Sequence, residues 1–173
     1  GKNLMFSLVL FQMMVPGQIF IIPQYLMVSK MGMLNTIFAL VFPGIVTAFG
    51  TFLLKQAYMG LPKDLEEAAR LDGCNIGQTF LFIMAAPLTR PSMGALGIFT
   101  AVFAYKDLMW PLICNKDVMP LSAALAKMQG QYTNNYPQLM AASLLACIPM
   151  IVLYLIFQKQ FIEGIATSGG KLE

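Results

Sequence analysis

The segment Leu61–Gly73, with the sequence LPKDLEEAARLDG, is the longest strongly charged stretch of a chain that is otherwise mostly apolar. Of the 173 residues, 58% are hydrophobic and 11% are charged, against about 45–50% and about 25% in ordinary soluble domains. Ions avoid hydrocarbon, so a charged stretch between apolar runs of near-spanning length must lie in water. The sequence therefore predicts an integral membrane protein whose spans are separated by this segment.

The charged segment itself is predicted to form a helix of about three turns. Pro62 suits the first turn, where its missing N–H costs nothing, and Asp64 lies near the positive end of the helix dipole. Gly73 is a typical stop for a helix. Asn75 then suits the cap of a second helix that begins near Ile76.

The two glutamates of this helix differ in their expected partners. Glu66 and Arg70 are at i and i+4 in the favourable order, a pair worth about 0.2–0.5 kcal/mol. Glu67 must share Arg70 at i+3 and otherwise has only Lys63 upstream. Glu67 is therefore the better candidate for a contact outside the chain, although a merely solvated interfacial hairpin fits the same residues.

The rest of the chain predicts an all-α, polytopic bundle with about four spans. The spans follow from apolar run lengths against a hydrocarbon core of about 30 Å. An external loop over residues 106–138 is expected to hold a short helix from Leu121 to Met128 and a polar turn at residues 130–136, and a polar tail is expected from Gln158. Trp110, Tyr132 and Tyr136 suit a membrane interface. The predicted spans are Leu4–Val28, Ile37–Leu54, Ser92–Tyr105 and Leu139–Phe157, with Phe80–Ala86 as an interfacial approach helix and Asn35 or Thr36 capping the second span.

Lysine and arginine are unevenly divided between the two sides of such a bundle. Four spans place the charged segment and the C-terminal tail on one side, and the bias of Lys and Arg marks that side as cytoplasmic. It carries Lys2, Lys55, Lys63, Arg70, Arg90, Lys159 and Lys171, against Lys30, Lys106, Lys116 and Lys127 on the other.

Several functional classes are disfavoured by what the sequence lacks. A net charge of +3 without a basic tract does not indicate a nucleic-acid partner. The chain has no histidine, its three cysteines lack metal-site spacing, and no GxxxxGK[ST] phosphate loop occurs. An intramembrane enzyme using Lys106 and Asp107 beside Trp110 is a weak alternative, and a channel or a secondary transporter is a stronger one, because proline-broken spans also suit substrate pathways.

The loop residues also carry a family resemblance. Glu67-Ala68-Ala69, followed after three residues by Gly73 and after nine more by Ile83, resembles the cytoplasmic loop motif of the permease subunits of ATP-binding-cassette importers. Residues 110–113 and 157–170 resemble the carbohydrate-uptake branch, and within it the maltose-type second permease. The resemblance covers nearly the whole chain as a single transmembrane permease domain, residues 1–173, of a bacterial-type plasma membrane.

This resemblance implies a mechanism and a set of partners. The coupling loop, residues 61–87, would dock on a cytoplasmic ATPase subunit dimer that binds ATP and Mg²⁺, so that this chain is not itself an enzyme and needs no cofactor or metal. A second permease subunit, an external solute-binding protein and the lipid bilayer complete the assembly. Glu67 would be the charged contact, Ala68 and Ala69 the close-packing surface and Gly73 the bend, with Arg70 and Asp72 in the same motif.

Two features qualify the resemblance. The family pattern places its proline one residue earlier than Pro87 stands here, so one residue is extra between Ile83 and Pro87. Members usually have six spans, which implies that about two N-terminal spans are missing. A sugar or oligosaccharide is inferred from the resemblance alone, and the polar residues that could line a substrate path are Gln12, Gln18, Thr47, Ser92 and Tyr105.

Overall fold

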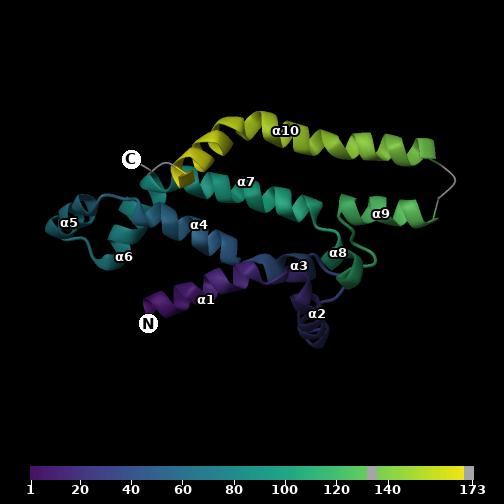
Figure 1. Cartoon of the computed structure of the whole chain (residues 1–173), viewed down its shortest axis with the longest axis horizontal. Helices are drawn as coiled ribbons and strands as arrows, with labels where there is room; N and C mark the ends of the chain where they lie inside the picture. Colours follow the sequence, from purple (N-terminus) through teal and green to yellow (C-terminus); the bar gives the residue numbers. More distant parts are fainter. Residues whose placement is uncertain (132–135, 170–173) are drawn as a thin grey trace. The chain divides into compact units, whose positions relative to one another are not determined.

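The computed structural model describes residues 1–131 and 136–169, and every regular element in those ranges is helical (Figure 1). This confirms the predicted all-α architecture. The α-helices are α1 (Lys2–Met14), α2 (Ile21–Lys30), α3 (Ile37–Val41), α4 (Ala48–Met59), α5 (Lys63–Leu71), α6 (Ile76–Gln78), α7 (Arg90–Lys106), α8 (Met109–Cys114), α9 (Leu121–Gln131) and α10 (Tyr136–Gly169).

The number of unbroken spans is smaller than the sequence suggested. Among the described residues, one helical segment, Tyr136–Gln158, is by itself long and apolar enough to cross a membrane. Two more spans result only if each bent helix pair counts as one, Lys2–Met14 with Gly17–Lys30 and Ile37–Gly44 with Ala48–Met59. The predicted third span corresponds to α7, whose 17 residues reach about 25 Å at 1.5 Å per residue. Length and composition therefore support one to three spans here rather than about four.

Pro16 accounts for the first of these two breaks. α1 ends at Met14, Pro16 is extended with ψ 125°, and a 3₁₀ turn, Gly17–Phe20, precedes α2. A proline lacks the N–H that would continue the helix and disfavours helical geometry at the residue before it. Pro23, by contrast, lies in the first turn of α2, where its missing N–H would have no partner within that helix.

Other expectations are confirmed or corrected near the C-terminus. α9 begins at Leu121 as predicted and extends to Gln131. The polar tail expected from Gln158 is helical as far as Gly169, where α10 ends. Tyr132 and most of the predicted polar turn, at residues 132–135, lie outside the described residues.

Two compact units can be distinguished and are described separately. The first comprises residues 1–10, 48–99 and those from 157 onward, and it includes the charged loop, which we define as residues 61–87. The second comprises residues 11–47 and 100–156.

The second unit has a small buried core between α2, α3 and α8. Val28, Ala39, Trp110 and Cys114 form this core. Trp110 is only 7% exposed, and its indole N–H donates to the carbonyl of Ala39 at 3.0 Å. The prediction that Trp110 anchors the chain at a membrane interface is therefore wrong, because its ring fills the core and its polar edge is satisfied by backbone.

Polar side chains tie the same unit together. Thr36 caps α3, because its hydroxyl accepts a hydrogen bond from the Ala39 N–H at 3.2 Å. Of the two predicted caps, Asn35 and Thr36, the second is therefore confirmed. Asn35, at φ 62°, instead accepts from the backbone N–H of Lys116 at 2.6 Å. The buried Asn115 amide donates to the carbonyls of Thr36 and Val118, each at 3.1 Å. The segment after α7 is thus folded back onto the start of α3.

Candidate coupling site

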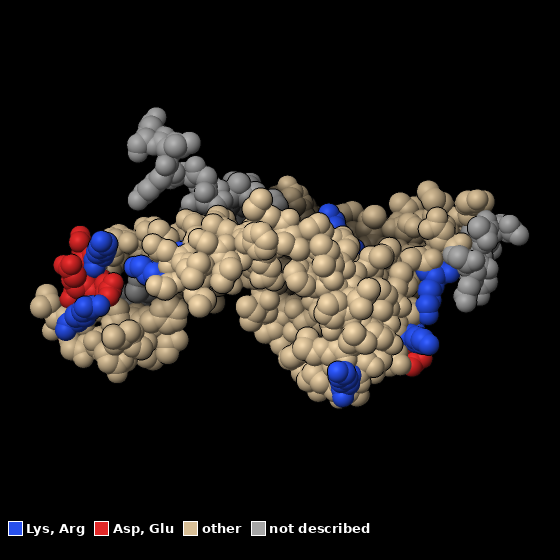
Figure 2. Space-filling view, turned by 60° about the horizontal axis from the view of Figure 1, so that its bottom comes forward, with Lys and Arg blue, Asp and Glu red and all other residues tan. Residues whose placement is uncertain are grey.

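The charged loop presents two short helices, α5 and α6, beyond the end of α4 (Figure 1). In the space-filling view, most of the visible acidic atoms gather around α5 together with basic side chains (Figure 2). α5 begins at Lys63, one residue after the extended Pro62, and carries Asp64 and Glu66 in its first turn and Arg70 in its last. Both charge positions suit the helix dipole.

The expected difference between the two glutamates is present. A carboxylate oxygen of Glu66 lies 2.5 Å from a guanidinium nitrogen of Arg70. Both side chains are substantially exposed, so the pair contributes about 0.3–0.5 kcal/mol at most. Glu67 is exposed and forms no ion pair with any described residue. Its carboxylate is therefore available to a basic group from outside the chain.

A tight bend at Gly73 ends α5. Gly73 has φ +82°, a left-handed conformation that glycine adopts without strain. The N–H of Gly73 donates to the Arg70 carbonyl at 3.1 Å, and the N–H of Cys74 donates to the Ala69 carbonyl at 3.0 Å. These two bonds form a Schellman motif, which satisfies carbonyls at the end of the helix. The predicted stop and bend at Gly73 are confirmed.

Asn75 caps the second helix as predicted, and it forms two reciprocal hydrogen bonds with Gln78. The Asn75 side chain accepts from the Gln78 N–H at 2.8 Å, and the Gln78 side chain accepts from the Asn75 N–H at 2.9 Å. The Thr79 hydroxyl also donates to the Asn75 carbonyl at 3.1 Å. The bend between the two helices is therefore fixed on both sides by hydrogen bonds.

The apolar residues of the charged loop divide into an inner and an outer set. Ala69 is 2% exposed and packs within the loop, whereas Ala68 faces outward. Leu71 and Ile76, on either side of the bend, are 89% and 83% exposed. We did not single out these two side chains from the sequence, although apolar residues flanking a glycine in a segment that must lie in water would have identified them.

A π-helix, η3 (Thr79–Leu88), leads from the charged loop to α7. Its hydrogen bonds run from i to i+5, so each turn takes in one residue more than an α-helical turn. The extra residue noted between Ile83 and Pro87 falls inside this segment. π-helical winding is therefore a direct way for the helix to hold that residue.

Two of the five candidate substrate-path residues line the same cavity in the second unit. Thr47 and Tyr105 line a cavity of about 1070 Å³ together with Thr100, Lys106 and Asp107. The Tyr105 hydroxyl also donates to the carbonyl of Ala146, in the turn before Pro149. This bond joins α7 to α10, so Tyr105 has a structural role as well.

The remaining path candidates are elsewhere. Gln12 and Gln18 are exposed in the second unit and do not line this cavity, and Ser92 belongs to the first unit. Trp110 is part of the cavity wall, but Lys106 and Asp107 form no ion pair with a described residue. Within the described ranges no group of three or more Cys, Asp or Glu side chains could hold a metal ion. The cavity lining is mostly apolar, with polar side chains at Thr47, Thr100, Tyr105, Lys106 and Asp107.

Residues 1–166 match the family of binding-protein-dependent transport system inner membrane components. The chain belongs to this family. Among curated relatives of this permease family, it is 36% identical to the arabinooligosaccharides transport system permease protein AraQ of Halalkalibacterium halodurans, over 99% of this chain and 62% of the relative. It is 34% identical to the sn-glycerol-3-phosphate transport system permease protein UgpE of Salmonella typhi, over 96% of this chain and 60% of the relative. The chain thus spans about three fifths of the length of these permeases.

A solved structure shares the fold. A chain of a bacterial ABC transporter involved in the import of the acidic polysaccharide alginate superposes with a TM-score of 0.77, over 93% of this chain and 62% of that one. The sequence identity is 23%, so this likeness concerns the fold alone. The fold and the family agree with the resemblance found in the sequence.

Proposed function

We propose that this chain is a permease subunit of an ATP-driven, binding-protein-dependent importer, and that its solute is a sugar or oligosaccharide. Family membership supports the importer class. The names of two relatives, which refer to arabinooligosaccharides and sn-glycerol-3-phosphate, favour a carbohydrate or a related polyol. A channel or a secondary transporter, which the broken spans also allow, would not belong to a family defined by binding proteins.

The observation that carries this proposal is the construction of the charged loop. Its bend is held by a Schellman motif and a capping box, so the loop can transmit a displacement rather than absorb it. Glu67 is exposed without an ion pair among the described residues, and Leu71 and Ile76 stand out from the bend. An apolar anchor beside an exposed carboxylate with no ion pair among the described residues suits docking into a groove on another protein.

In this proposal α5 and the bend dock on a cytoplasmic ATPase subunit, and the loop transmits closure of the ATPase dimer to the spans. Glu67 supplies the charged contact, with Arg70 and Asp72 beside it. Ala68 allows close approach of the partner, Ala69 packs the loop from within, and Gly73 sets the bend. The partner subunit binds ATP and Mg²⁺, since the sequence given contains no phosphate-binding loop.

The other partners follow from the same class of transporter. A second permease subunit covers the apolar faces of the bundle, and an external solute-binding protein delivers the solute. The charged loop and α10's C-terminal end face the cytoplasm of a bacterial-type cell. Thr47 and Tyr105 are the path candidates that share a cavity, which favours them over Gln12, Gln18 and Ser92.

The test is ATP-dependent uptake of radiolabelled arabinooligosaccharides by proteoliposomes containing the full-length permease, its partner permease and the ATPase subunit, with binding protein supplied. Gly73→Pro is expected to abolish uptake, because proline requires φ near −65° and removes the N–H that donates to Arg70. Gly73→Asn is the matched control. Asparagine tolerates positive φ, and no atom lies within 4 Å of the added Cβ.

A second matched pair isolates the charged contact. Glu67→Gln is expected to reduce both uptake and solute-stimulated ATP hydrolysis. Glu66→Gln removes only an exposed ion pair within the helix, so most of the uptake and most of the ATP hydrolysis should remain. All variants must insert and assemble like the parent. Unchanged uptake in Gly73→Pro and Glu67→Gln would overturn the coupling role, and ATP-independent transport would overturn the importer class.

A further inference from the structure

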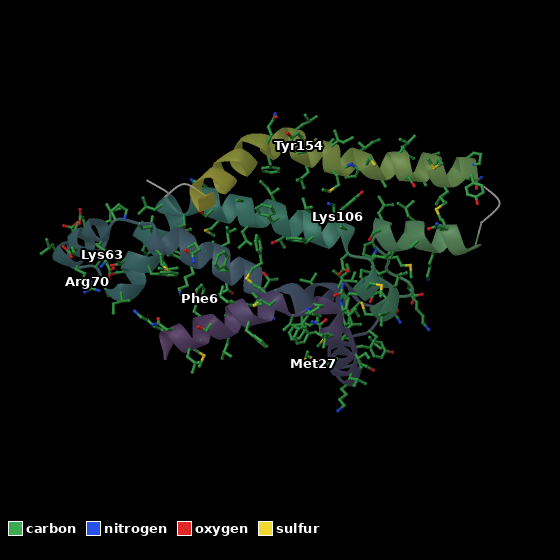
Figure 3. The ribbon with its side chains drawn as sticks, viewed as in Figure 1. Phe6, Met27, Lys63, Arg70, Lys106 and Tyr154 are labelled. Carbon is green, nitrogen blue, oxygen red and sulfur yellow. The ribbon has the colours of Figure 1, made fainter. Side chains whose placement is uncertain are left out.

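A second surface groove lies in the first unit, between α1 and the C-terminal half of α4. Its volume is about 480 Å³. The two helices meet through stacked rings of Phe6 and Phe52, with centroids 6.2 Å apart and planes inclined by 11°. Figure 3 shows Phe6 between α1 and α4. The groove is lined by Lys2, Asn3, Met5, Phe6, Val9, Thr51, Lys55 and Met59.

The charge of this groove is entirely positive. Two of its eight lining residues are lysines and none is acidic. The Lys55 ammonium nitrogen lies 3.0 Å from the centroid of the Phe6 ring, a cation–π contact that holds the charge at the groove. Neither Lys2 nor Lys55 forms an ion pair with a described carboxylate. The ammonium protons of Lys55 therefore remain available to an anion.

The remainder of the lining is mostly apolar. Met5, Phe6, Val9 and Met59 form a hydrocarbon surface beside the two ammonium groups. A small inorganic anion would leave that surface uncovered. A ligand that satisfies both parts needs an anionic head and an apolar body.

The groove also lies at the level where α4 leaves the apolar region. Met59 is the last residue of α4, and α5 of the charged loop begins four residues later. Lys2 and Lys55 are both on the side that the distribution of Lys and Arg marks as cytoplasmic. Basic pockets between membrane helices on that side bind anionic lipid headgroups.

We propose that this groove is a binding site for an anionic phospholipid of the inner leaflet. The phosphate group pairs with Lys55 and Lys2, and an acyl chain lies against Met5, Val9 and Met59. A lipid held there packs α1 against α4 directly below the charged loop. The site requires the membrane location of the chain and is independent of which solute is transported.

Native mass spectrometry of the full-length permease, released from nanodiscs of equal parts dioleoylphosphatidylglycerol and dioleoylphosphatidylcholine, tests the site. The parent is expected to retain phosphatidylglycerol preferentially. In Lys55→Gln that preference should fall about fivefold, the effect of one basic residue near an anionic surface. Lys55→Arg keeps the charge and should keep the preference.

Arg90→Gln is the matched control, because it removes one positive charge at the start of α7 without touching the groove. Its lipid preference should equal that of the parent. An unchanged preference in Lys55→Gln, or an equal loss in Arg90→Gln, would overturn the proposal. Displacement of the bound lipid by excess inorganic phosphate would assign the site to a free anion instead. Uptake is not part of this readout, so its result is separable from the coupling test.

Discussion

Asn75 and Gln78 cap each other, since each side-chain oxygen accepts a hydrogen bond from the other's backbone N–H, at 2.8 and 2.9 Å. A helix as short as α6, three residues long, has few internal hydrogen bonds of its own. The capping box therefore fixes the direction in which the chain leaves the bend at Gly73 and enters the π-helix.

Asn75→Ala is expected to loosen this exit. Loss of an N-cap side chain costs about 1 kcal/mol, and here it leaves the Gln78 backbone N–H without the Asn75 side-chain oxygen that accepts its hydrogen bond. Hydrogen exchange measured by mass spectrometry should show faster exchange at residues 75–79 and little change in α10. Asn75→Asp retains a capping oxygen and should exchange like the parent, so equal exchange in all three proteins would contradict the proposed role of the cap.

Trp110 is the only tryptophan among these 173 residues. Its burial can be observed by fluorescence in a protein whose tryptophans outside these residues, if any, are replaced by phenylalanine. A buried indole should emit at short wavelength and resist quenching by acrylamide. Trp110→Phe leaves the Ala39 carbonyl without its donor, at a cost of about 1–3 kcal/mol, and should lower the melting temperature. Met109→Leu, at a neighbouring exposed position, is the control. Ready quenching of the parent protein would place Trp110 at the membrane interface instead.

The cysteines offer a test of the same core by alkylation. Burial raises the pKa of the Cys114 thiol, an effect that the nearby Asp107 charge reinforces and a backbone hydrogen bond opposes. Only the thiolate reacts quickly, so near neutral pH Cys114 should react with N-ethylmaleimide more slowly than the half-buried Cys74. Its rate should keep rising with pH beyond the ordinary thiol range. Equal labelling of the two cysteines in the folded protein would contradict the buried core, and denaturation should equalise them.

The sequence predicted the local features of the charged loop more accurately than it predicted the number of spans. Glu66 with Arg70, the stop at Gly73 and the cap at Asn75 depend on neighbours within five residues, so spacing alone predicts them. The inward position of Ala69 and the burial of Trp110 depend on segments far apart in the chain. Composition could not show these contacts. The break at Pro16 was visible in the sequence, but whether it bends or ends a span depends on packing.

The π-helix η3 provides the last prediction. The resemblance seen in the sequence implies one extra residue between Ile83 and Pro87. These residues lie in the π-helix, in which a turn holds one residue more than an α-helical turn. Deleting Ala86 should therefore let this segment wind as an α-helix without rotating α7 relative to the charged loop. We expect membrane insertion and ATP-dependent uptake to stay near the parent level and the melting temperature to be equal or higher.

The matched control is a deletion inside a regular α-helix, because such a helix contains no surplus residue. Deleting the exposed Gly97 from α7 removes no side chain, but it turns everything beyond it by about 100°. That rotation should displace the buried Ile98 and strongly reduce uptake. If deletion of Ala86 reduced uptake as much as deletion of Gly97, the extra residue would be required for the native orientation of α7 relative to the charged loop. The π-helix would then set the direction of α7 rather than compensate for an insertion.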